Sequence, residues 1–369
     1  MKLRTMSCAL VMSAAAAMGV PEVAAARPFL DGLKTIHTIA SAVPRGGPAK
    51  GDVNPYGVAV VRRSTGRLIK GDVLVSNFND AKNEQGTGSS IMEVSPSGGA
   101  KVFAVVPRPT TSPAVGLTTA LVELRQGFVI VGSLPAPGGK SSRARAGALT
   151  ILDGDGQVVG TYTAPDINGP WDMTAVDHGS RATLFVTNVL NGTVAARDKV
   201  VHRGTVVRLD LSIPAGGMPQ VMSNTVIATG FAEHTDPDAL VVGPTGVGLG
   251  RGGVLYVADS NGNRIAAIPG ALTRMSAMGG GGRTVSKGGA LNDPLGLAIT
   301  PGGDVLSANG GDGKFVETSP AGRQVAVKQL IANGGGDLFG LAIAPGRRGV
   351  YFVDDAGSGP GANSLRLLL

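Results

Sequence analysis

Six short segments of this sequence each place a small or polar residue beside a bend that leads into an apolar run. The residues at these bends are Asn54, Thr118, Asp172, Pro244, Asp293 and Asp337. If the segments converge in space, the four oxygen-rich members, Asn54, Asp172, Asp293 and Asp337, could hold a hard divalent cation such as Ca²⁺. Asn and Asp also cap backbone N–H groups in tight turns, so a turn-forming role for the same residues stays open.

Two further groups of side chains could recognise a ligand. Glu233, His234 and Asp236 form a dense polar cluster, which is either a metal or acid–base site or a solvated surface turn. Lys140, Arg143 and Arg145 lie in a stretch rich in Gly, Ser and Pro. This composition predicts an exposed loop that could bind a partner.

The composition limits the elements that can position these residues. The chain has 369 residues, of which 58 are Gly and 23 are Pro, and this excludes a mainly helical fold. Hydrophobic residues make up 43% of the chain, enough for a large core. The net charge of +7 is dispersed along the chain, and we expect no nucleic-acid binding.

The first 26 residues predict the location of the protein. Lys2 and Arg4 precede an uncharged apolar stretch, and Ala24 to Ala26 provide the small residues that a signal peptidase accepts. The apolar stretch is too short to span a bilayer, and no later one is long enough. We therefore expect a signal peptide over residues 1–26, cleavage near Ala26, and export to the periplasm or the medium. Cys8, the one cysteine, would be removed with this segment.

A repeat of about 40 to 50 residues predicts the architecture. Each copy reads as a bend, a short apolar strand, a Gly-rich turn, and a second apolar strand that ends in Asp, Asn or a similar residue. The clearest copies pair 243–249 with 254–259, 293–299 with 304–309, and 337–343 with 349–354. Three weaker copies start near 54, 118 and 169, so the six repeats start near 54, 118, 169, 243, 292 and 336.

Further β-branched runs separated by Asp-Gly, Ser-Gly and Gly-Gly turns extend each repeat to a four-stranded antiparallel sheet. Six such sheets around an axis predict an all-β, six-bladed β-propeller. The last copy lacks a fourth strand, whereas residues 34–40 form an alternating strand without a blade. We therefore predict one domain over residues 27–369, in which residues 27–53 supply the strand that closes the ring.

The segment from Pro244 to Arg264 resembles the NHL repeat, and the resemblance extends more loosely over most of residues 54–369. NHL-type propellers are similar to the gluconolactonase/regucalcin family and to streptogramin lyase. This resemblance implies the propeller fold. It also implies that a metal in such a fold would be held by Glu, Asn and Asp at inner-strand positions, but here Asp293 and Asp337 lie one position ahead of the matching site.

These observations favour a monomeric binding scaffold over an enzyme. Its channel mouth and long loops would recognise a protein, glycan or small molecule. The alternative is a metal-dependent, lactonase-like hydrolase in which one divalent cation, such as Ca²⁺, is held by Asn54, Asp172, Asp293 and Asp337.

Overall fold

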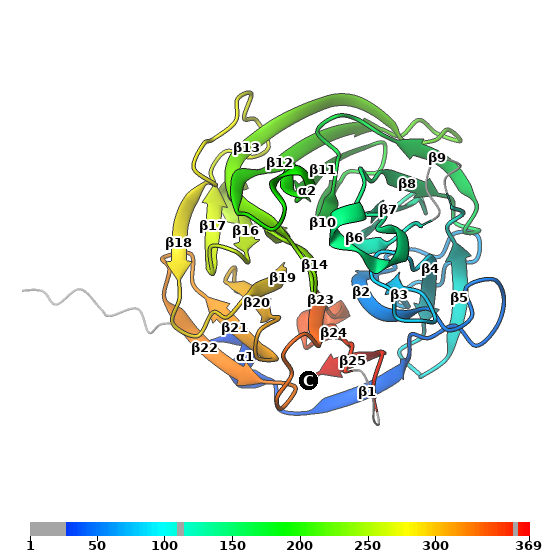
Figure 1. Cartoon of the computed structure of the whole chain (residues 1–369). Helices are drawn as coiled ribbons and strands as arrows, with labels where there is room; N and C mark the ends of the chain where they lie inside the picture. Colours follow the sequence, from blue (N-terminus) through cyan, green and yellow to red (C-terminus); the bar gives the residue numbers. More distant parts are fainter. Residues whose placement is uncertain (1–26, 109–113, 357–360) are drawn as a thin grey trace, which may run out of the picture.

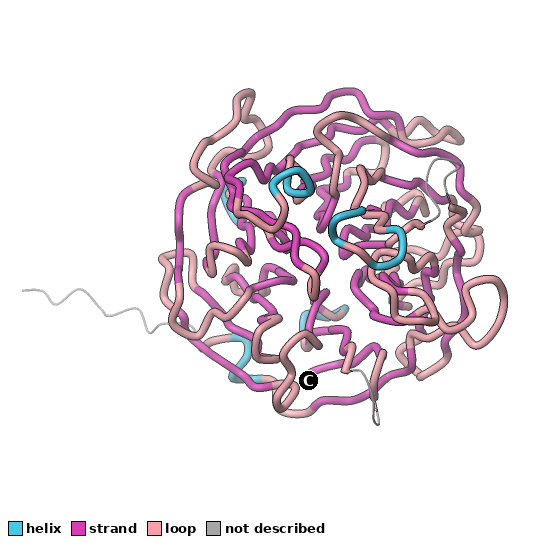
Figure 2. Tube along the Cα trace, in the orientation of Figure 1, coloured by secondary structure: helices cyan, strands magenta, loops and turns pink. Residues whose placement is uncertain are grey.

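The computed structural model describes residues 27–108, 114–356 and 361–369. They form six antiparallel sheets arranged as blades around a central axis (Figure 1). The predicted all-β, six-bladed propeller is therefore confirmed. Figure 2 shows that helix is confined to a few short turns, which include α1 (Phe29–Gly32) and α2 (Thr193–Ala196).

The first two blades each contain four strands in chain order, with the first strand nearest the axis. Blade 1 comprises β2 (Val53–Val60), β3 (Val73–Asn79), β4 (Ser90–Val94) and β5 (Ala100–Val105). Blade 2 comprises β6 (Leu117–Glu123), β7 (Val129–Ser133), β8 (Leu149–Leu152) and β9 (Val158–Tyr162).

Blade 3 has five strands instead of the predicted four. It comprises β10 (Pro170–Asp177), β11 (Arg181–Asn188), β12 (Val201–Ser212), β13 (Gln220–Asp236) and β14 (Leu240–Val242). The outer strand β13 is long because it continues past its blade and pairs with β14 in a hairpin. Figure 1 shows that β14 runs toward the centre of the ring.

Blades 4 and 5 return to four strands. Blade 4 comprises β15 (Pro244–Leu249), β16 (Leu255–Asp259), β17 (Arg264–Ile268) and β18 (Arg283–Lys287). Blade 5 comprises β19 (Pro294–Ile299), β20 (Val305–Asn309), β21 (Lys314–Thr318) and β22 (Gln324–Gln329).

Blade 6 joins the two ends of the chain, as the sequence predicts. It comprises β23 (Leu338–Ile343), β24 (Val350–Asp354), β25 (Ser364–Leu368) and the N-terminal β1 (Ile36–Ser41). Strand β1 pairs antiparallel with β25, from Ile36 opposite Leu368 to Ser41 opposite Ser364. The ring is thus closed by backbone hydrogen bonds between the first and last strands.

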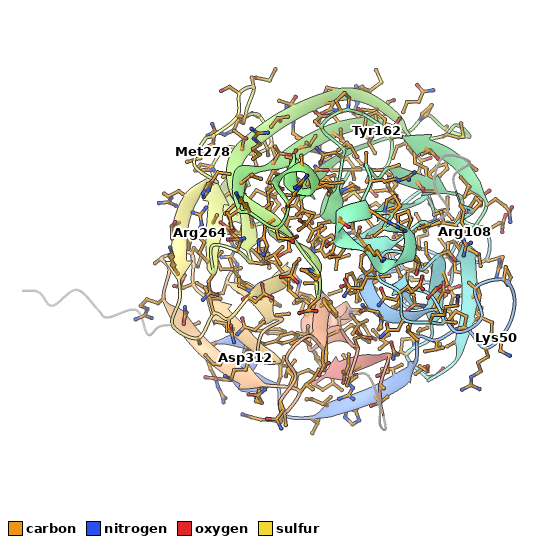
Figure 3. The ribbon with its side chains drawn as sticks, viewed as in Figure 1. Lys50, Arg108, Tyr162, Arg264, Met278 and Asp312 are labelled. Carbon is orange, nitrogen blue, oxygen red and sulfur yellow. The ribbon has the colours of Figure 1, made fainter. Side chains whose placement is uncertain are left out.

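The core lies between neighbouring blades. Strands such as β3, β7, β16, β20 and β24 are buried along their whole length, so they read as continuous apolar runs rather than alternating ones. One apolar cluster, for example, packs Ile130 of blade 2 against Leu184 of blade 3. Figure 3 shows side chains filling the spaces between the blades. Arg264, labelled there, forms an ion pair of 2.7 Å with Asp259 within blade 4.

The predicted signal peptide lies outside the described residues. Within the described ranges, no helix is long and apolar enough to span a membrane.

Candidate functional site

The first strand of every blade contains a β-bulge at the same level of the ring. In five blades, two residues of the first strand lie opposite one of the second; in blade 3, for example, the register shifts between Pro170 and Met173. In blade 2 the bulge is one residue longer. A bulge of this kind redirects side chains, so it determines what faces the channel.

Glycine occupies the last bulge position in four of the six blades. These residues are Gly57, Gly246, Gly296 and Gly340. A Cβ atom at Gly340 would overlap the backbone oxygen of Tyr56 in the next blade, and one at Gly296 would overlap that of Phe339. Glycine is therefore needed because the first strands approach one another closely here. Blades 2 and 3 carry side chains at this level instead, Thr119 and Asp172.

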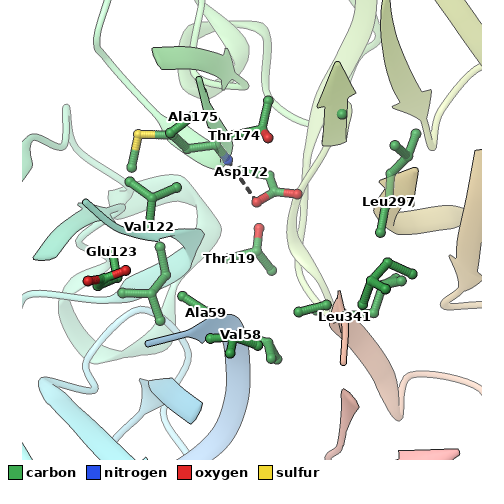
Figure 4. Close-up of a pocket in the computed structure, with 18 of the residues that line it drawn as sticks. Val58, Ala59, Thr119, Val122, Glu123, Asp172, Thr174, Ala175, Leu297 and Leu341 are labelled. Carbon is green, nitrogen blue, oxygen red and sulfur yellow. Dashed lines mark hydrogen bonds between the residues drawn. The ribbon is translucent and has the colours of Figure 1, made fainter. Parts of the chain in front are cut away.

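The channel contains a cavity of about 640 Å³, which we call the channel cavity. The second halves of all six first strands line it, mainly with Val, Leu, Ile, Met and Ala side chains (Figure 4). The lining continues to the exposed residues Arg62, Lys70 and Pro345, where the first strands end. We call this end of the channel the open mouth.

Asp172 is the deepest acidic side chain of the channel cavity. Figure 4 shows it between Thr119 and Thr174, facing Leu297 and Leu341 across the cavity. Its carboxylate accepts a hydrogen bond of 2.7 Å from the backbone N–H of Met173. Burial raises the pKa of Asp172 well above its usual value, and backbone hydrogen bonds from Met173 and Val247 oppose this rise. When protonated, a carboxyl group in this environment can both donate and accept a hydrogen bond.

Glu123 is a second acidic residue that lines the channel cavity, close to the open mouth. The side chain is 3% exposed, and one carboxylate oxygen accepts the backbone N–H of Arg62 at 3.1 Å. The other oxygen has no hydrogen-bond partner among the described residues. Burial raises the pKa of Glu123 to about 7, while Arg62 lowers it in part.

The opposite end of the channel, where the first strands begin, is covered by the β13–β14 hairpin; we call it the capped mouth. Leu240 and Val241 are buried against an aromatic cluster of Tyr56, Phe78 and Trp171. Tyr56 stacks on Phe78 with ring centroids 4.5 Å apart, and the Trp171 ring meets Tyr56 edge-on at 5.8 Å. The hairpin reaches the far side of the ring, where the side-chain amide of Gln85 donates to the backbone oxygen of Asp238.

The candidate cation ligands do not form one cluster. Asp172 faces the channel cavity. Asn54 is the second residue of β2, Asp293 and Asp337 directly precede β19 and β23, and none of these three lines the cavity. Within the described ranges, no three Asp, Glu, His or Cys side chains are placed to hold a metal ion. These residues therefore do not fit the cation that the resemblance implies. The prediction grouped Asp172 with the others because all four residues lie at the bends that lead into the first strands.

Asn54 and Asp293 both have left-handed backbone conformations, with φ of 59° and 53°. Asn and Asp tolerate this conformation better than other residues with a Cβ, which explains these residue types at the start of the first strands. Burial raises the pKa of Asp293, and repulsion from Asp236 adds to this rise. Burial and the neighbouring Asp337 raise the pKa of Asp355, which is also near the capped mouth, to about 7.

The structure places Glu233 in a different environment from His234 and Asp236. Glu233 is fully buried, and its carboxylate accepts the backbone N–H of Asn191 at 3.1 Å, so a solvated turn is the wrong description of this residue. Burial raises its pKa to about 7. His234 contacts Asn261 at 2.6 Å and lies 3.7 Å from Asp236, at the base of the hairpin.

Lys140, Arg143 and Arg145 are exposed in a loop, as predicted. The loop is nevertheless anchored, because Ala136 and Ala144 beside these residues are buried in the aromatic cluster under the capped mouth. Removing this loop would therefore expose part of the core.

Comparison with known proteins supports the propeller fold but identifies no family. No family model matches the sequence, and no curated protein matches it. Among solved structures, a regucalcin from Agrobacterium tumefaciens has a TM-score of 0.54 at 13% identity, over 89% of this chain and 94% of that one. A gluconolactonase from Xanthomonas campestris has a TM-score of 0.53 at 13% identity, over 90% and 88% of the two chains.

An aldose sugar dehydrogenase from Streptomyces coelicolor is equally similar, with a TM-score of 0.54 at 15% identity, over 90% of this chain and 97% of that one. The regucalcin is described as a calcium-binding protein and the dehydrogenase as binding PQQ. Proteins of different activity therefore share this architecture at low identity. The chain is a six-bladed β-propeller similar to gluconolactonase and regucalcin propellers, and its function must be argued from its own channel.

Proposed function

We propose that this protein binds an apolar small molecule in the channel cavity, with Asp172 as the polar anchor. The observation that carries the proposal is the carboxyl group of Asp172, which faces a mainly apolar cavity of about 640 Å³ (Figure 4). Known ligand sites have volumes of roughly 300–1,000 Å³ and combine apolar walls with a few polar groups.

The position of Asp172 supports a role in binding because it has a cost in the free protein. Burial disfavours the charged carboxylate of Asp172 and so raises its pKa, although the backbone N–H groups of Met173 and Val247 reduce this cost by hydrogen bonding to it. Glycine at the equivalent position of four other blades avoids this cost. A ligand hydroxyl or carbonyl group that pairs with the carboxyl of Asp172 would offset it.

A second candidate function is hydrolysis of a lactone or ester in the same cavity. A carboxyl group whose pKa is raised keeps its proton to a higher pH and can donate it to a leaving oxygen, and burial raises the pKa of Asp172 in this way. The similarity to a gluconolactonase in fold is compatible with this chemistry. The metal-dependent form of this hypothesis has less support, because the described residues do not form a cation site.

We retain two further parts of the proposal, export and a monomeric state. Export depends on the composition of residues 1–26, which precede the described ranges. N-terminal sequencing of the protein from its native host tests it, and a mature chain that still begins at Met1 would contradict it.

Binding can be tested with the neutral apolar dye N-phenyl-1-naphthylamine. Trp171, the one tryptophan of the chain, precedes Asp172 and can report binding by energy transfer. We expect saturable binding that Thr174→Phe abolishes, because Thr174 lines the cavity. Thr161→Phe on the outer strand β9 is the matched control, since Thr161 is exposed at the outer edge of blade 2. Equal dye binding by the two variants would contradict the proposal.

A further inference from the structure

The open mouth carries an excess of positive charge. The loops that join the first and second strands of the blades, residues 61–72, 124–128, 178–180, 250–254, 300–304 and 344–349, meet at this end of the ring. They contain eight Arg or Lys residues, which are Arg62, Arg63, Arg67, Lys70, Arg125, Arg251, Arg347 and Arg348. The same loops contain two acidic residues, Asp72, which is buried, and Asp304, which is half-buried.

Two of these cations belong to the cavity itself. Arg62 and Lys70 line the channel cavity at its rim, and both side chains are exposed. Neither takes part in any ion pair found within the described ranges. Arg67 differs, because its guanidinium group donates to the backbone oxygen of Val102 at 2.9 Å and is directed to the outer edge of blade 1.

The acidic groups near this rim do not neutralise the cations. Glu123 is the acidic residue of the cavity nearest to Arg62, and burial keeps its pKa at about 7, so part of the population is uncharged at neutral pH. Asp177 is buried and accepts the backbone N–H of Arg125. The two mouths therefore differ, since the capped mouth gathers Asp293, Asp337 and Asp355 near the axis.

We propose that the ligand of the channel cavity is an amphipathic anion, whose apolar body lies along the channel and whose carboxylate, sulfonate or phosphate group lies at the open mouth against Arg62 and Lys70. This inference rests on the proposed binding function and adds the chemical class and the orientation of the ligand. Apolar walls supply most of the affinity, and exposed cations at a rim select the charge of the head group and speed its capture.

The test compares three ligands that share one apolar tail and differ in the charge of the head group. N-phenyl-1-naphthylamine is bound to the full chain and then displaced with decanoate, 1-decanol or decyltrimethylammonium, each below its micelle concentration. We expect decanoate to bind most tightly and the cation most weakly, with about a tenfold difference between them. Added salt should reduce this difference, because exposed charges are screened.

The variant Arg62→Gln with Lys70→Gln should remove the preference for decanoate over 1-decanol, with each displacement measured against that variant's own dye affinity. The matched control is Arg283→Gln with Lys287→Gln on the outer strand β18, which makes the same change in net charge away from the channel. Equal affinity for the three head groups, or an unchanged preference in the Arg62/Lys70 variant, would overturn the anion inference while the binding function stands. Absence of dye binding that Thr174→Phe affects would instead overturn the binding function, and with it this inference.

Discussion

Glu123→Gln tests whether the channel cavity buries a costly charge near its open mouth. The side chain is 3% exposed, and its pKa rises from the ordinary 4.5 to about 7 because burial disfavours the carboxylate. A raised carboxyl pKa means that the folded protein holds the proton more tightly than the unfolded chain does. The stabilising contribution is therefore complete below about pH 4.5 and is lost as the pH rises through 7.

The size of this effect follows from the two pKa values. Proton linkage with values of 4.5 and about 7 makes the folded state less stable by about 2.5 kcal/mol at pH 8 than at pH 5. In a domain of roughly 340 residues this corresponds to about 3–4 °C in melting temperature. Glutamine keeps an oxygen for the N–H of Arg62 and carries no charge, so Glu123→Gln should lack this contribution.

The assay is thermal unfolding of both proteins between about pH 5 and pH 8, followed by circular dichroism. The melting temperature of Glu123→Gln relative to that of the native chain should increase with pH. Glu93→Gln is a control of opposite sign, because Glu93 is equally buried but pairs with Lys101 at 3.0 Å, and the variant should lower the melting temperature. A difference between Glu123→Gln and the native chain that does not change with pH would refute the reasoning.

Three further predictions concern the level of the bulges and the capped mouth. Asp172→Asn should increase the melting temperature at neutral and alkaline pH, because it removes a carboxyl whose pKa is raised by burial, and should weaken dye binding; calorimetry at about pH 8 and the dye titration measure both. Gly340→Ala should destabilise the protein by more than about 3 kcal/mol in urea unfolding, because the new Cβ would overlap the backbone oxygen of Tyr56. Gly302→Ala is the control and should have little effect, because the atom nearest to its new Cβ would be 3.7 Å away. Leu240→Ala should cost about 2–4 kcal/mol and shift Trp171 emission to the red, because Leu240 is fully buried against the aromatic cluster of the capped mouth; unchanged emission would mean that the hairpin does not exclude water there.

Repetition made the fold predictable from the sequence. The bend, the two apolar strands and the terminal Asp or Asn recur often enough to number the blades, and the unpaired strand at residues 34–40 predicted the closure that β1 makes with β25. The fifth strand of blade 3 was not predictable in this way. Residues 240–242 form a strand because β13 extends past its blade, and one copy of a repeat contains no information about such an extension.

The functional site was less predictable because its position depends on which end of the channel is open. The candidate cation ligands predicted from the sequence include residues at the start of the first strands, such as Asn54 and Asp293, and the hairpin covers this end. One signal was nevertheless present. When the repeats are aligned on the bend, Asp172 occupies the position held by Gly57, Gly246, Gly296 and Gly340 in four other blades. An acidic residue at a position that is glycine in most repeats indicates a site where the fold is locally less stable.

The two ends of the channel differ for a physical reason that links fold to function. At the bulges the first strands approach so closely that only glycine fits in most blades, so the channel is narrow and lined by backbone at that level. Beyond the bulges the same strands diverge around the channel cavity, and side chains such as Leu297 and Leu341 face it. Because the hairpin and Trp171 close the narrow end, a ligand would enter past Arg62 and Lys70 and stop at Asp172. The β-bulges therefore set the inner end of the channel cavity, where Asp172 lies, and the loops at the open mouth contribute its cations.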